Sequence, residues 1–395
     1  MNTTKTEASY PMVARTLRGL EPVLAEELRA LGAGDVQAQN LAVAFTGNDR
    51  LLVRANLWLR TGLRIIKPIH RVTLENQQDL YDAARQYDWS RHLKTSDTFA
   101  IDTAVHSPLF TNSQFVAFRV KDAIVDRFRD TTGRRPSVDI KKPTLRIHVH
   151  ILRKQCVFSL DSSGQSLHRR GYRKQAEAAP IMESLAAGLI LLSGWKKDTP
   201  FYDPMCGAGT IAIEAALLGA GIPPGWQRRH FGFLNWPGFS PDLWEAEKEA
   251  VRREVAQTAQ TLKERPLRII ARDLSPDAIA TAHENARRAG LPPGYIDFQV
   301  QPFDEFIPAE PGVIVMNPPY GERLQKKNID RFYKHIGDHL KQKCAGSSAW
   351  ILSSNLEALK QVGLQANSKI TVYNGPLQCS FREYRLYSGS RSAAQ

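Results

Sequence analysis

The sequence predicts an α/β protein in which a doubly wound sheet of seven strands follows smaller α+β units. Two observations support this fold class. From residue 199 onward, short apolar runs alternate with helical segments, which is typical of a parallel sheet covered by helices on both faces. Residues 10–165 instead show two shorter series of strands and helices, and a chain of 395 residues has room for two or three such units.

The first unit, residues 10–70, is expected to be a ferredoxin-like α+β region. Apolar residues at helical spacing predict a helix over 21–31, and a second helix is expected over 49–58. Short apolar runs between turn residues predict strands at 13–16, 41–46 and 64–70.

The second unit, residues 71–165, is another α+β region. A strand is expected over 98–104, and two further strands, 145–152 and 156–162, form a hairpin around Arg153-Lys154. A helix is expected over 112–129, with one broad apolar face made of Phe115, Phe118, Ile124, Val125 and Phe128. Residues 166–198 follow as a basic linker and a leading helix that begins near Pro180.

The third unit, residues 199–390, carries the alternating pattern of the doubly wound sheet. An insertion over about 219–266 holds aromatic residues beside positive charges, and it is either a substrate platform or a satellite core. The seven expected strands are 199–203, 267–273, 296–300, 312–316, 348–353, 369–373 and 383–387.

The composition points to a polyanionic partner. Lysine and arginine number 53 against 40 acidic residues, which gives a formal net charge of +13 and a pI of about 9.6. Such a balance favours nucleic acid. We see no apolar stretch long enough to span a bilayer and no secretory leader pattern, so a cytoplasmic protein without a membrane partner is expected. The four cysteines form no close pair and have no histidine at metal-ligand spacing, so neither a metal site nor a disulfide framework is expected.

A glycine-rich loop follows the first strand of the third unit. Gly207 and Gly209 permit a tight turn and the close approach of a ligand to the backbone. A G-x-G without a third glycine is a weak dinucleotide signal, and an ordinary strand-to-helix turn is the competing interpretation. We expect the loop Asp203–Thr210, including Met205 and Thr210, to hold the amino-acid end of a nucleoside cofactor.

Acidic residues follow the next two strands. Asp273, with Leu274 after it, is positioned to accept hydrogen bonds from both hydroxyls of a ribose, or else it belongs to a helix N-cap. Asp304 follows the third strand and could accept the exocyclic amine of an adenine. More than about 20 residues separate Gly209 from Asp273, which departs from the dinucleotide fingerprint.

The most informative stretch is Asn317-Pro318-Pro319-Tyr320, directly after a β-branched run. The run predicts a buried parallel strand that delivers Asn317 to the carboxyl end of the sheet, where open α/β sheets build their sites. Two prolines stiffen the turn and remove two amide donors. The Asn317 amide oxygen and the Pro318 carbonyl could then accept both hydrogens of an exocyclic amine while Tyr320 stacks on the base. Together with the preceding loop and acids, this set describes S-adenosylmethionine beside an amine-bearing base.

At this point the chain resembles the class I RNA methyltransferases that carry an amino-terminal THUMP domain. It is most similar to the bacterial 23S rRNA guanine-N2 methyltransferases of the position-2445 type that have a single methyltransferase domain. Members of the family often have Ser at the position of Ala208, a small change that leaves the glycines intact. The motifs that carry the resemblance are Asn112–Phe115, Val120–Asp126, His168–Arg173, Asp203–Thr210 and Asn317–Arg323.

The resemblance implies a Rossmann-like class I methyltransferase domain after ferredoxin-like and THUMP domains. It also implies S-adenosylmethionine as cofactor, RNA as partner (23S rRNA or a ribosomal assembly intermediate), and methyl transfer to guanine N2. The basic residues offered as RNA contacts are Arg134, Arg135, Lys141, Lys142, Arg153, Lys154, Arg169, Arg170 and Arg173.

Two alternatives remain open on the sequence. A DNA adenine-N6 methyltransferase would use Asn-Pro-Pro-Tyr equally well, because its target is also an exocyclic amine. A non-catalytic RNA-binding assembly factor would need a decayed cofactor loop, yet Asp203, Gly207 and Gly209 are all present.

Overall fold

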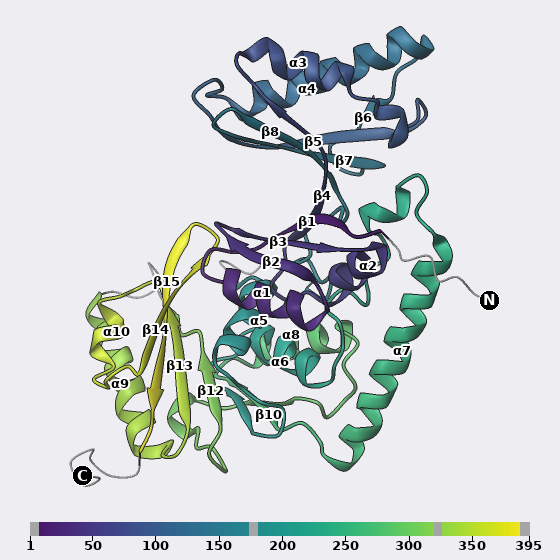
Figure 1. The fold of residues 1–395 in the computed structure, drawn as a ribbon. Helices are drawn as coiled ribbons and strands as arrows, with labels where there is room; N and C mark the ends of the chain where they lie inside the picture. Colours follow the sequence, from purple (N-terminus) through teal and green to yellow (C-terminus); the bar gives the residue numbers. More distant parts are fainter. Residues whose placement is uncertain (1–7, 174–180, 320–325, 388–395) are drawn as a thin grey trace.

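The structure of the chain is a computed structural model that describes residues 8–173, 181–319 and 326–387. Strands of the described residues form two sheets, one of eight strands near the amino end and one of seven near the carboxyl end (Figure 1). Pro180, where the sequence predicts a helix start, and Tyr320, the predicted stacking residue, lie outside the described residues.

The first unit has two helices on one face of its strands. Both helices pack their apolar sides, including Leu24 and Leu52, into one core. The strand β2 is absent from the sequence prediction because its residues Gly-Asp-Val-Gln-Ala-Gln lack an apolar run, and pairing with β3 creates it. The elements are β1 (Tyr10–Arg15), α1 (Glu21–Ala30), β2 (Gly34–Gln39), β3 (Ala42–Gly47), α2 (Asp49–Trp58) and β4 (Arg64–Thr73).

The second unit places two helices over one face of its own strands. Phe128 of α4 is buried as predicted, but Phe115 and Phe118 are 43% and 53% exposed, so the predicted single apolar face is wrong for these two rings. Asn112 caps α4 by accepting hydrogen bonds from the amides of Gln114 and Phe115. The elements are α3 (Gln77–Gln86), β5 (Thr98–His106), α4 (Ser113–Thr132), β6 (Ser137–Val138), β7 (Leu145–Leu152) and β8 (Gln155–Asp161).

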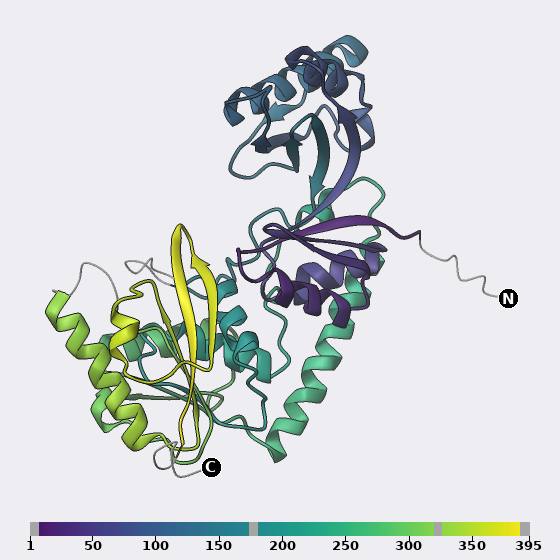
Figure 2. The ribbon, with the colours of Figure 1, turned by 60° about the vertical axis from the view of Figure 1, so that its left-hand side comes forward.

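The strands of both units belong to one continuous sheet, in the order β2-β3-β1-β4-β8-β7-β5-β6. The strand β4 makes this possible, since residues 64–66 at its start pair with β1 and residues 66–73 pair with β8. The expected boundary at residue 70 therefore falls inside a strand. A register shift between Pro68 and His70 marks the place where the sheet changes direction. Figures 1 and 2 show α1 and α2 on one side of this bend and α3 and α4 on the other.

The carboxyl-terminal sheet has the order β11-β10-β9-β12-β13-β15-β14. Six strands run in the same direction, and β15 is antiparallel to both of its neighbours, β13 and β14. This arrangement confirms the predicted seven-stranded doubly wound sheet. The last strand begins earlier than predicted, at Leu377, because Gly375 at φ +61° closes a tight hairpin after β14. The strands are β9 (Phe201–Asp203), β10 (Ile269–Asp273), β11 (Asp297–Val300), β12 (Val313–Met316), β13 (Ser348–Ser353), β14 (Ser368–Asn374) and β15 (Leu377–Arg385).

Helices cover both faces of this sheet and bury one apolar core on each. One core includes residues of the leading helix α5, of α6 and of α8, and the other includes residues of α9 and α10. Within the described part of the chain, no helix is long and apolar enough to cross a membrane. The helices are α5 (Glu183–Leu192), α6 (Thr210–Gly219), α8 (Pro276–Arg288), α9 (Lys326–Lys343) and α10 (Ala358–Gln361).

The insertion after α6 folds back onto the first unit. Its residues Phe231, Phe233 and Val251 are buried in the core beneath α1 and α2, which supports the satellite-core interpretation over the substrate platform. The long helix α7 (Pro241–Glu264) then lies along α2, and Figure 1 shows it at the side of the molecule. Arg54 of α2 forms ion pairs with Glu247 and Glu254 of α7.

Candidate active site

The carboxyl ends of three neighbouring strands bring the predicted cofactor and amine-binding residues to one edge of the sheet. The strand β9 lies between β10 and β12, and all three run parallel. Asp203 ends β9, Asp273 ends β10, and Asn317 directly follows β12. From β9 the chain continues to β10 on one side, whereas from β12 it continues to β13 on the other side, so the carboxyl ends of β9 and β12 form the topological switch point at which doubly wound sheets bind ligands.

The loop after β9 requires both of its glycines. Gly207 and Gly209 have φ values of +51° and +79°, in the left-handed region. A Cβ atom on Gly209 would stand 2.9 Å from the Cβ atom of Ala282, so helix α8 packs directly against the loop. Nothing lies within 4 Å of a Cβ built on Gly207, so this side of the backbone is open to a ligand.

A residue that sequence reasoning did not single out holds the same loop. The buried amide of Asn285 donates from Nδ2 to the carbonyl of Ala208 at 3.1 Å. Asn285 lies on α8, three residues after the buried Ala282, so it occupies a core-facing position of the helix. A polar amide at an apolar position is the sequence signal that could have identified it.

Asp273 joins the cofactor loop to the start of α8. One carboxylate oxygen accepts the amide hydrogen of Gly207 at 2.8 Å, and the other accepts that of Ser275 at 2.9 Å. Each oxygen has a second lone pair, so these bonds leave acceptor capacity for a ligand. The neighbouring Leu274 is 70% exposed, which places an apolar surface beside the carboxylate.

Asp203 is a buried carboxylate without a cation. It is 1% exposed, and neither carboxylate oxygen has a hydrogen-bond partner within normal geometry among the described residues. Burial, and to a smaller extent the charge of Asp273, raise the pKa of Asp203 to about 8, against a weaker opposing effect of the Ala212 and Met205 amides. A cationic ligand at this position would relieve the cost of ionising Asp203.

Asn317 presents an unpartnered acceptor at the same edge. Its Oδ1 atom is buried and has no hydrogen-bond partner among the described residues. Pro318 is buried and Pro319 is exposed, so the side chain stands on a rigid and partly covered turn. A buried acceptor of this kind costs free energy unless a ligand supplies a donor.

Asp304 lies farther along the edge, beyond β10. It is exposed and hydrogen bonded to His335 of α9, in a short turn after β11. The strand β11 that precedes it neighbours β10, and the contact with His335 places the Asp304 side chain beside α9, the helix that follows β12.

These features fit S-adenosylmethionine. The unpartnered carboxylate of Asp203 suits an α-ammonium group, the open face of Gly207 admits close backbone approach, and Asp273 retains acceptor capacity for ribose hydroxyls. Among the described residues, no group of three or more His, Cys, Asp or Glu could hold a metal ion.

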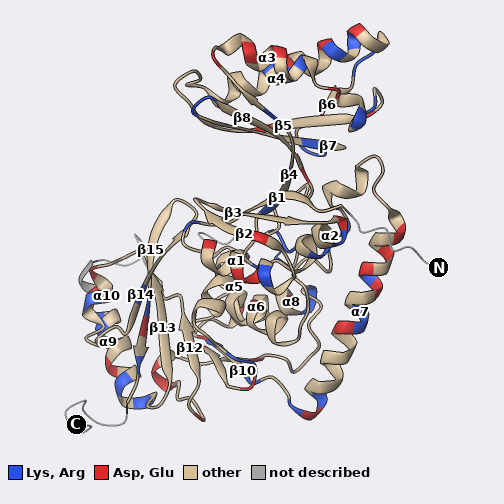
Figure 3. Ribbon diagram, in the orientation of Figure 1, with Lys and Arg blue, Asp and Glu red and all other residues tan. Residues whose placement is uncertain are grey.

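The basic residues predicted to contact RNA do not form one cluster. Arg134, Arg135, Lys141 and Lys142 are exposed around β6, near the start of β7, whereas Arg153 and Lys154 lie in the turn after its end. A strand rises about 3.3 Å per residue, so the length of β7 separates the two groups by roughly 25 Å. Figure 3 shows lysine and arginine on β7 and on the loop beside β6.

The structure contradicts the predicted RNA contact of Arg170. This residue is only 5% exposed, and its guanidinium faces Glu214 at 3.5 Å and donates to the carbonyls of Leu167 and Arg60. Arg173 is also engaged, in an ion pair with Glu183 at 2.8 Å. Arg170 and Arg173 of the basic linker therefore form ion pairs within the protein.

Two other residues predicted to contact RNA, Lys154 and Arg169, lie at the surface. Lys154 is paired with Glu75 on the surface. Arg169 is exposed, and its carbonyl accepts from Arg228.

A seven-stranded sheet of this order, with an acceptor-rich edge at its switch point, defines a class I S-adenosylmethionine-dependent methyltransferase. Three family models match the chain. The model described as "RMKL-like, methyltransferase domain" matches residues 170–383, the THUMP domain matches residues 75–161, and the RlmL ferredoxin-like domain matches residues 11–66. The chain belongs to the RMKL-like methyltransferase family, and S-adenosylmethionine is its cofactor.

Curated relatives agree with this membership. A protein of Synechocystis sp. with the provisional name RNA methyltransferase is 39% identical over 95% of this chain and 97% of its own. A ribosomal RNA large subunit methyltransferase K/L of Syntrophotalea carbinolica is 37% identical over 96% of this chain and 54% of its own. The chain therefore spans nearly all of the first relative and about half of the K/L relative.

Solved structures share the whole architecture. A protein provisionally named a methyltransferase, in complex with S-adenosylhomocysteine, has a TM-score of 0.83 at 30% identity, covering 98% of this chain and 100% of that one. A Listeria monocytogenes protein named as a predicted N6-adenine-specific DNA methylase also has a TM-score of 0.83, at 31% identity, covering 96% of this chain and 97% of that one.

Proposed function

We propose that this chain transfers the methyl group of S-adenosylmethionine to the exocyclic N2 amine of a guanine in large-subunit ribosomal RNA, at a site of the position-2445 type in 23S rRNA. The single observation that carries the proposal is the buried, unpartnered Oδ1 atom of Asn317, on the strand next to the unpartnered carboxylate of Asp203. The first group needs a hydrogen-bond donor and the second needs a cation. An amine-bearing base and the amino-acid end of the cofactor supply them.

Asn317 and Pro318 would act on the nucleophile. Guanine N2 is a poor nucleophile because its lone pair is delocalised into the ring. Hydrogen bonds from the amine to Asn317 Oδ1 and to the Pro318 carbonyl favour a nitrogen that is becoming tetrahedral, and this is electrostatic stabilisation of the transition state. The cofactor supplies an electrophilic methyl group on its sulfonium.

Position and burial account for the rest of the rate enhancement. Asp203, Gly207 and Asp273 fix one reactant while the turn at Asn317 fixes the other, so nitrogen and methyl carbon meet in line. No residue has to act as a strong base, because the product ammonium is acidic and can lose its proton late. Tyr320 is proposed to stack on the base and Asp304 to accept the adenine amine.

Several observations support RNA rather than DNA as the substrate. Residues 75–161 match the THUMP domain, and the K/L relative is named for ribosomal RNA. The chain also carries a net charge of +13. The name of the Listeria protein favours the second candidate, a DNA adenine-N6 methyltransferase, because both targets are exocyclic amines.

The two candidates are separated by a substrate comparison. The protein is incubated with methyl-labelled S-adenosylmethionine and either ribosomal RNA from cells that lack this protein or duplex DNA free of adenine methylation. The proposal expects label in RNA as N2-methylguanosine and none in DNA. Label in DNA as N6-methyladenine would establish the second candidate instead.

Calorimetry with S-adenosylmethionine distinguishes an enzyme from a non-catalytic RNA-binding factor, because it measures cofactor affinity. The intact cofactor loop predicts binding that the Gly209→Val variant loses, because a larger side chain there collides with Ala282. A wild-type protein without cofactor affinity would favour a binding factor over an enzyme.

A further inference from the structure

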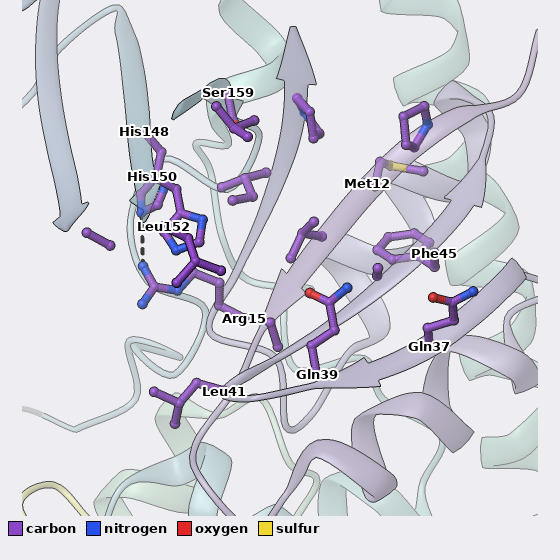
Figure 4. A pocket seen from close by; sticks show the side chains of 18 of the residues that line it. Met12, Arg15, Gln37, Gln39, Leu41, Phe45, His148, His150, Leu152 and Ser159 are labelled. Carbon is purple, nitrogen blue, oxygen red and sulfur yellow. Dashed lines mark hydrogen bonds between the residues drawn. The ribbon is translucent and has the colours of Figure 1, made fainter. Parts of the chain in front are cut away.

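The face of the eight-stranded sheet that carries no helix is hollowed into a trough. Helices α1 and α2 cover the other face of the first unit, and α3 and α4 cover that of the second. Because the sheet bends at β4, the two bare faces turn toward each other and enclose a cavity of about 860 Å³ (Figures 1 and 4). Strands from both units line this cavity.

Alternation along the strands decides which side chains enter the trough. Small side chains lie along its floor, with larger apolar residues such as Met12, Phe45 and Leu152 also in the lining; the small residues are Val13, Ala44, Ala104, Val157 and Ser159. Each lies between neighbours that point into the helix-covered cores, as the period of a strand requires. Small side chains at the centre of a bare sheet leave room for a ligand to lie against the strands.

Hydrogen-bonding groups stand around this floor. Gln37 and Gln39 project from β2 along one side in Figure 4, with Asn40 in the turn that follows, and Gln155 stands on β8. Amide side chains both donate and accept, which matches the mixed pattern of nucleic-acid base edges.

The charge of the trough favours an anion. Of the lining residues, Arg15 and Arg71 are cationic and Asp35 is the acid. His148, His150 and His106 also line the cavity. Burial, and to a smaller extent the charge of Arg15, lower the pKa of His148 to about 4, so His148 is neutral at pH 7. Burial and Arg15 also lower the pKa of His150.

His148 provides a donor without a partner. Its Nε2 atom lies 3.0 Å from Nη1 of Arg15, and arginine can only donate, so Nε2 is the acceptor and the proton is on Nδ1. His148 is 5% exposed, and Nδ1 has no hydrogen-bond partner among the described residues. The wall of the trough thus contains a buried donor that an acceptor on a ligand would satisfy.

The trough is held in place relative to the methyltransferase domain. Its rim residue Leu41 donates its amide hydrogen to Glu21 at 3.0 Å, and the same carboxylate accepts from the amide of Gly19 at 2.7 Å. A Cβ atom on Gly19 would stand 2.4 Å from the carbonyl oxygen of Thr371 in β14. Close backbone packing therefore joins the rim to the catalytic sheet.

We infer that the trough binds a short single-stranded segment of the RNA substrate, with Arg15 and Arg71 on phosphates and the glutamines on base edges. The inference rests on the proposed function and specifies how its substrate is held. A concave floor bounded by amide groups suits unstacked nucleotides, whose base edges are accessible, whereas duplex RNA offers mainly shape and backbone. The site is distinct from the exposed lysines and arginines around β6.

Substitutions that add negative charge to the trough without changing side-chain size test the inference. The double variant Gln37→Glu/Gln39→Glu is isosteric and sits on an exposed strand, so it should fold normally. Its matched control, Gln86→Glu/Gln114→Glu, adds the same charge to exposed positions on the helix-covered side. We expect the trough variant to bind a fluorescent single-stranded RNA of about ten nucleotides at least roughly 10-fold more weakly, and the control to bind as the wild type does.

Two further tests are the salt dependence of RNA binding and a substitution that fills the floor of the trough. Arg71→Gln should reduce the log–log salt slope of single-strand binding by roughly 0.7, the value for one lost phosphate contact. Ala44→Glu should block the floor, whereas Ala38→Glu, which alternation places on the opposite face of the neighbouring strand, should not. Calorimetry with S-adenosylmethionine should be unchanged in every variant, which shows that the catalytic domain is intact.

Two results would overturn the inference. One is normal single-strand binding by both Gln37→Glu/Gln39→Glu and Ala44→Glu. The other is equal weakening of duplex and single-stranded RNA, which would leave the trough without preference for unpaired nucleotides. Either result is compatible with normal methyl transfer by the wild-type protein, so the proposed function would stand or fall separately.

Discussion

At the scale of single residues, two buried groups without partners define the site. Asp203 ends β9 and Asn317 directly follows the adjacent parallel strand β12, and each carries an oxygen that the described residues leave unsatisfied. Such groups are rare in folded proteins because they cost free energy. A carboxylate that awaits a cation and an amide that awaits a donor are complementary to the two reactants of an amine methylation.

The first prediction concerns a proton at Asp203. Its pKa of about 8 means that the carboxyl is mostly protonated at pH 7 in the free protein. Binding of a cationic α-ammonium should ionise it, so cofactor binding should release close to one proton at pH 7 and tighten as pH rises toward 8. Calorimetry in buffers of different ionisation enthalpy measures this release.

Asp203→Asn is the matched control for the proton. It should bind the cofactor without proton release and more weakly. The raised pKa also means that the folded protein holds a proton that the unfolded chain has lost between pH 3.8 and about 8, so this group lowers the free energy of unfolding as pH rises through that window. Asp203→Asn should therefore melt at a higher temperature than the wild type at pH 8. A flat binding profile from pH 6 to 8 would contradict the assignment.

The second prediction concerns Asp273. Its carboxylate holds the amide of Gly207 and is proposed to bind the ribose, so Asp273→Ala should lose both functions. Hydrogen bonds to a charged group contribute about 1.5–3 kcal/mol, so cofactor affinity should fall roughly 10- to 150-fold. Asp277→Ala, at an exposed position in the first turn of α8, is the control. Unchanged affinity in Asp273→Ala would remove the ribose assignment.

The third prediction separates chemistry from binding at Asn317. Asn317→Ala should lose about 10²–10³ in turnover, the typical cost of one preorganised stabilising group, while cofactor and RNA affinities change little. Asn317→Asp should keep more activity, because a carboxylate still accepts from the amine. Single-turnover methylation at saturating cofactor and RNA makes the measurement, and near-normal turnover by Asn317→Ala would mean that another group stabilises the transition state.

At the scale of elements, the sequence predicted those strands and loops that depend on neighbouring residues, and it missed features that depend on residues far away in the chain. The strands of the catalytic sheet are apolar runs, and the ends of β9, β10 and β12 could be located from sequence because loop residues follow each run directly. The polar strand β2 could not be predicted, because pairing with β3 rather than propensity forms it. Ion pairs between residues far apart in the sequence, such as Arg170 with Glu214, could not be predicted either.

The trough shows the same limit. His148 and His150 alternate visibly along the chain, but nothing local reveals that their strand faces β2 across a bent sheet. The exposure of Phe115 and Phe118 was missed because helical spacing alone does not tell which side of α4 meets the strands.

The fourth prediction concerns the basic segment before β7. Lys141 and Lys142 are exposed, and their amides donate to Asp139, which fixes the turn that presents them. Lys141→Glu/Lys142→Glu should weaken RNA binding and reduce its log–log salt slope by roughly 0.7–0.9 for each lost phosphate contact. The same change at the exposed Lys196 and Lys197, in the loop after α5, serves as control. Equal slopes for both pairs would reduce the segment to a solvated face.

At the scale of the whole molecule, side-chain packing joins the amino-terminal units to the catalytic domain. The insertion packs its aromatic residues beneath α1 and α2, while Arg60 and Arg170 reach across to α6, the helix that follows the cofactor loop. Figures 1 and 2 show the eight-stranded sheet above the catalytic sheet, with α7 running down from the first unit. Under the proposed function, the distance between the bound RNA and the methyl group would therefore be set by this packing rather than by a flexible linker.

The most direct test of the account is the identity of the methylated atom. Ribosomal RNA from cells that lack the protein is incubated with isotopically labelled S-adenosylmethionine and either wild-type protein or Asn317→Ala, then digested to nucleosides for mass spectrometry. The proposed function predicts labelled N2-methylguanosine at one site of the large-subunit RNA with the wild type, and about 10²–10³-fold slower formation with the variant. Label on another atom or base, or equal rates for the two proteins, would contradict the account.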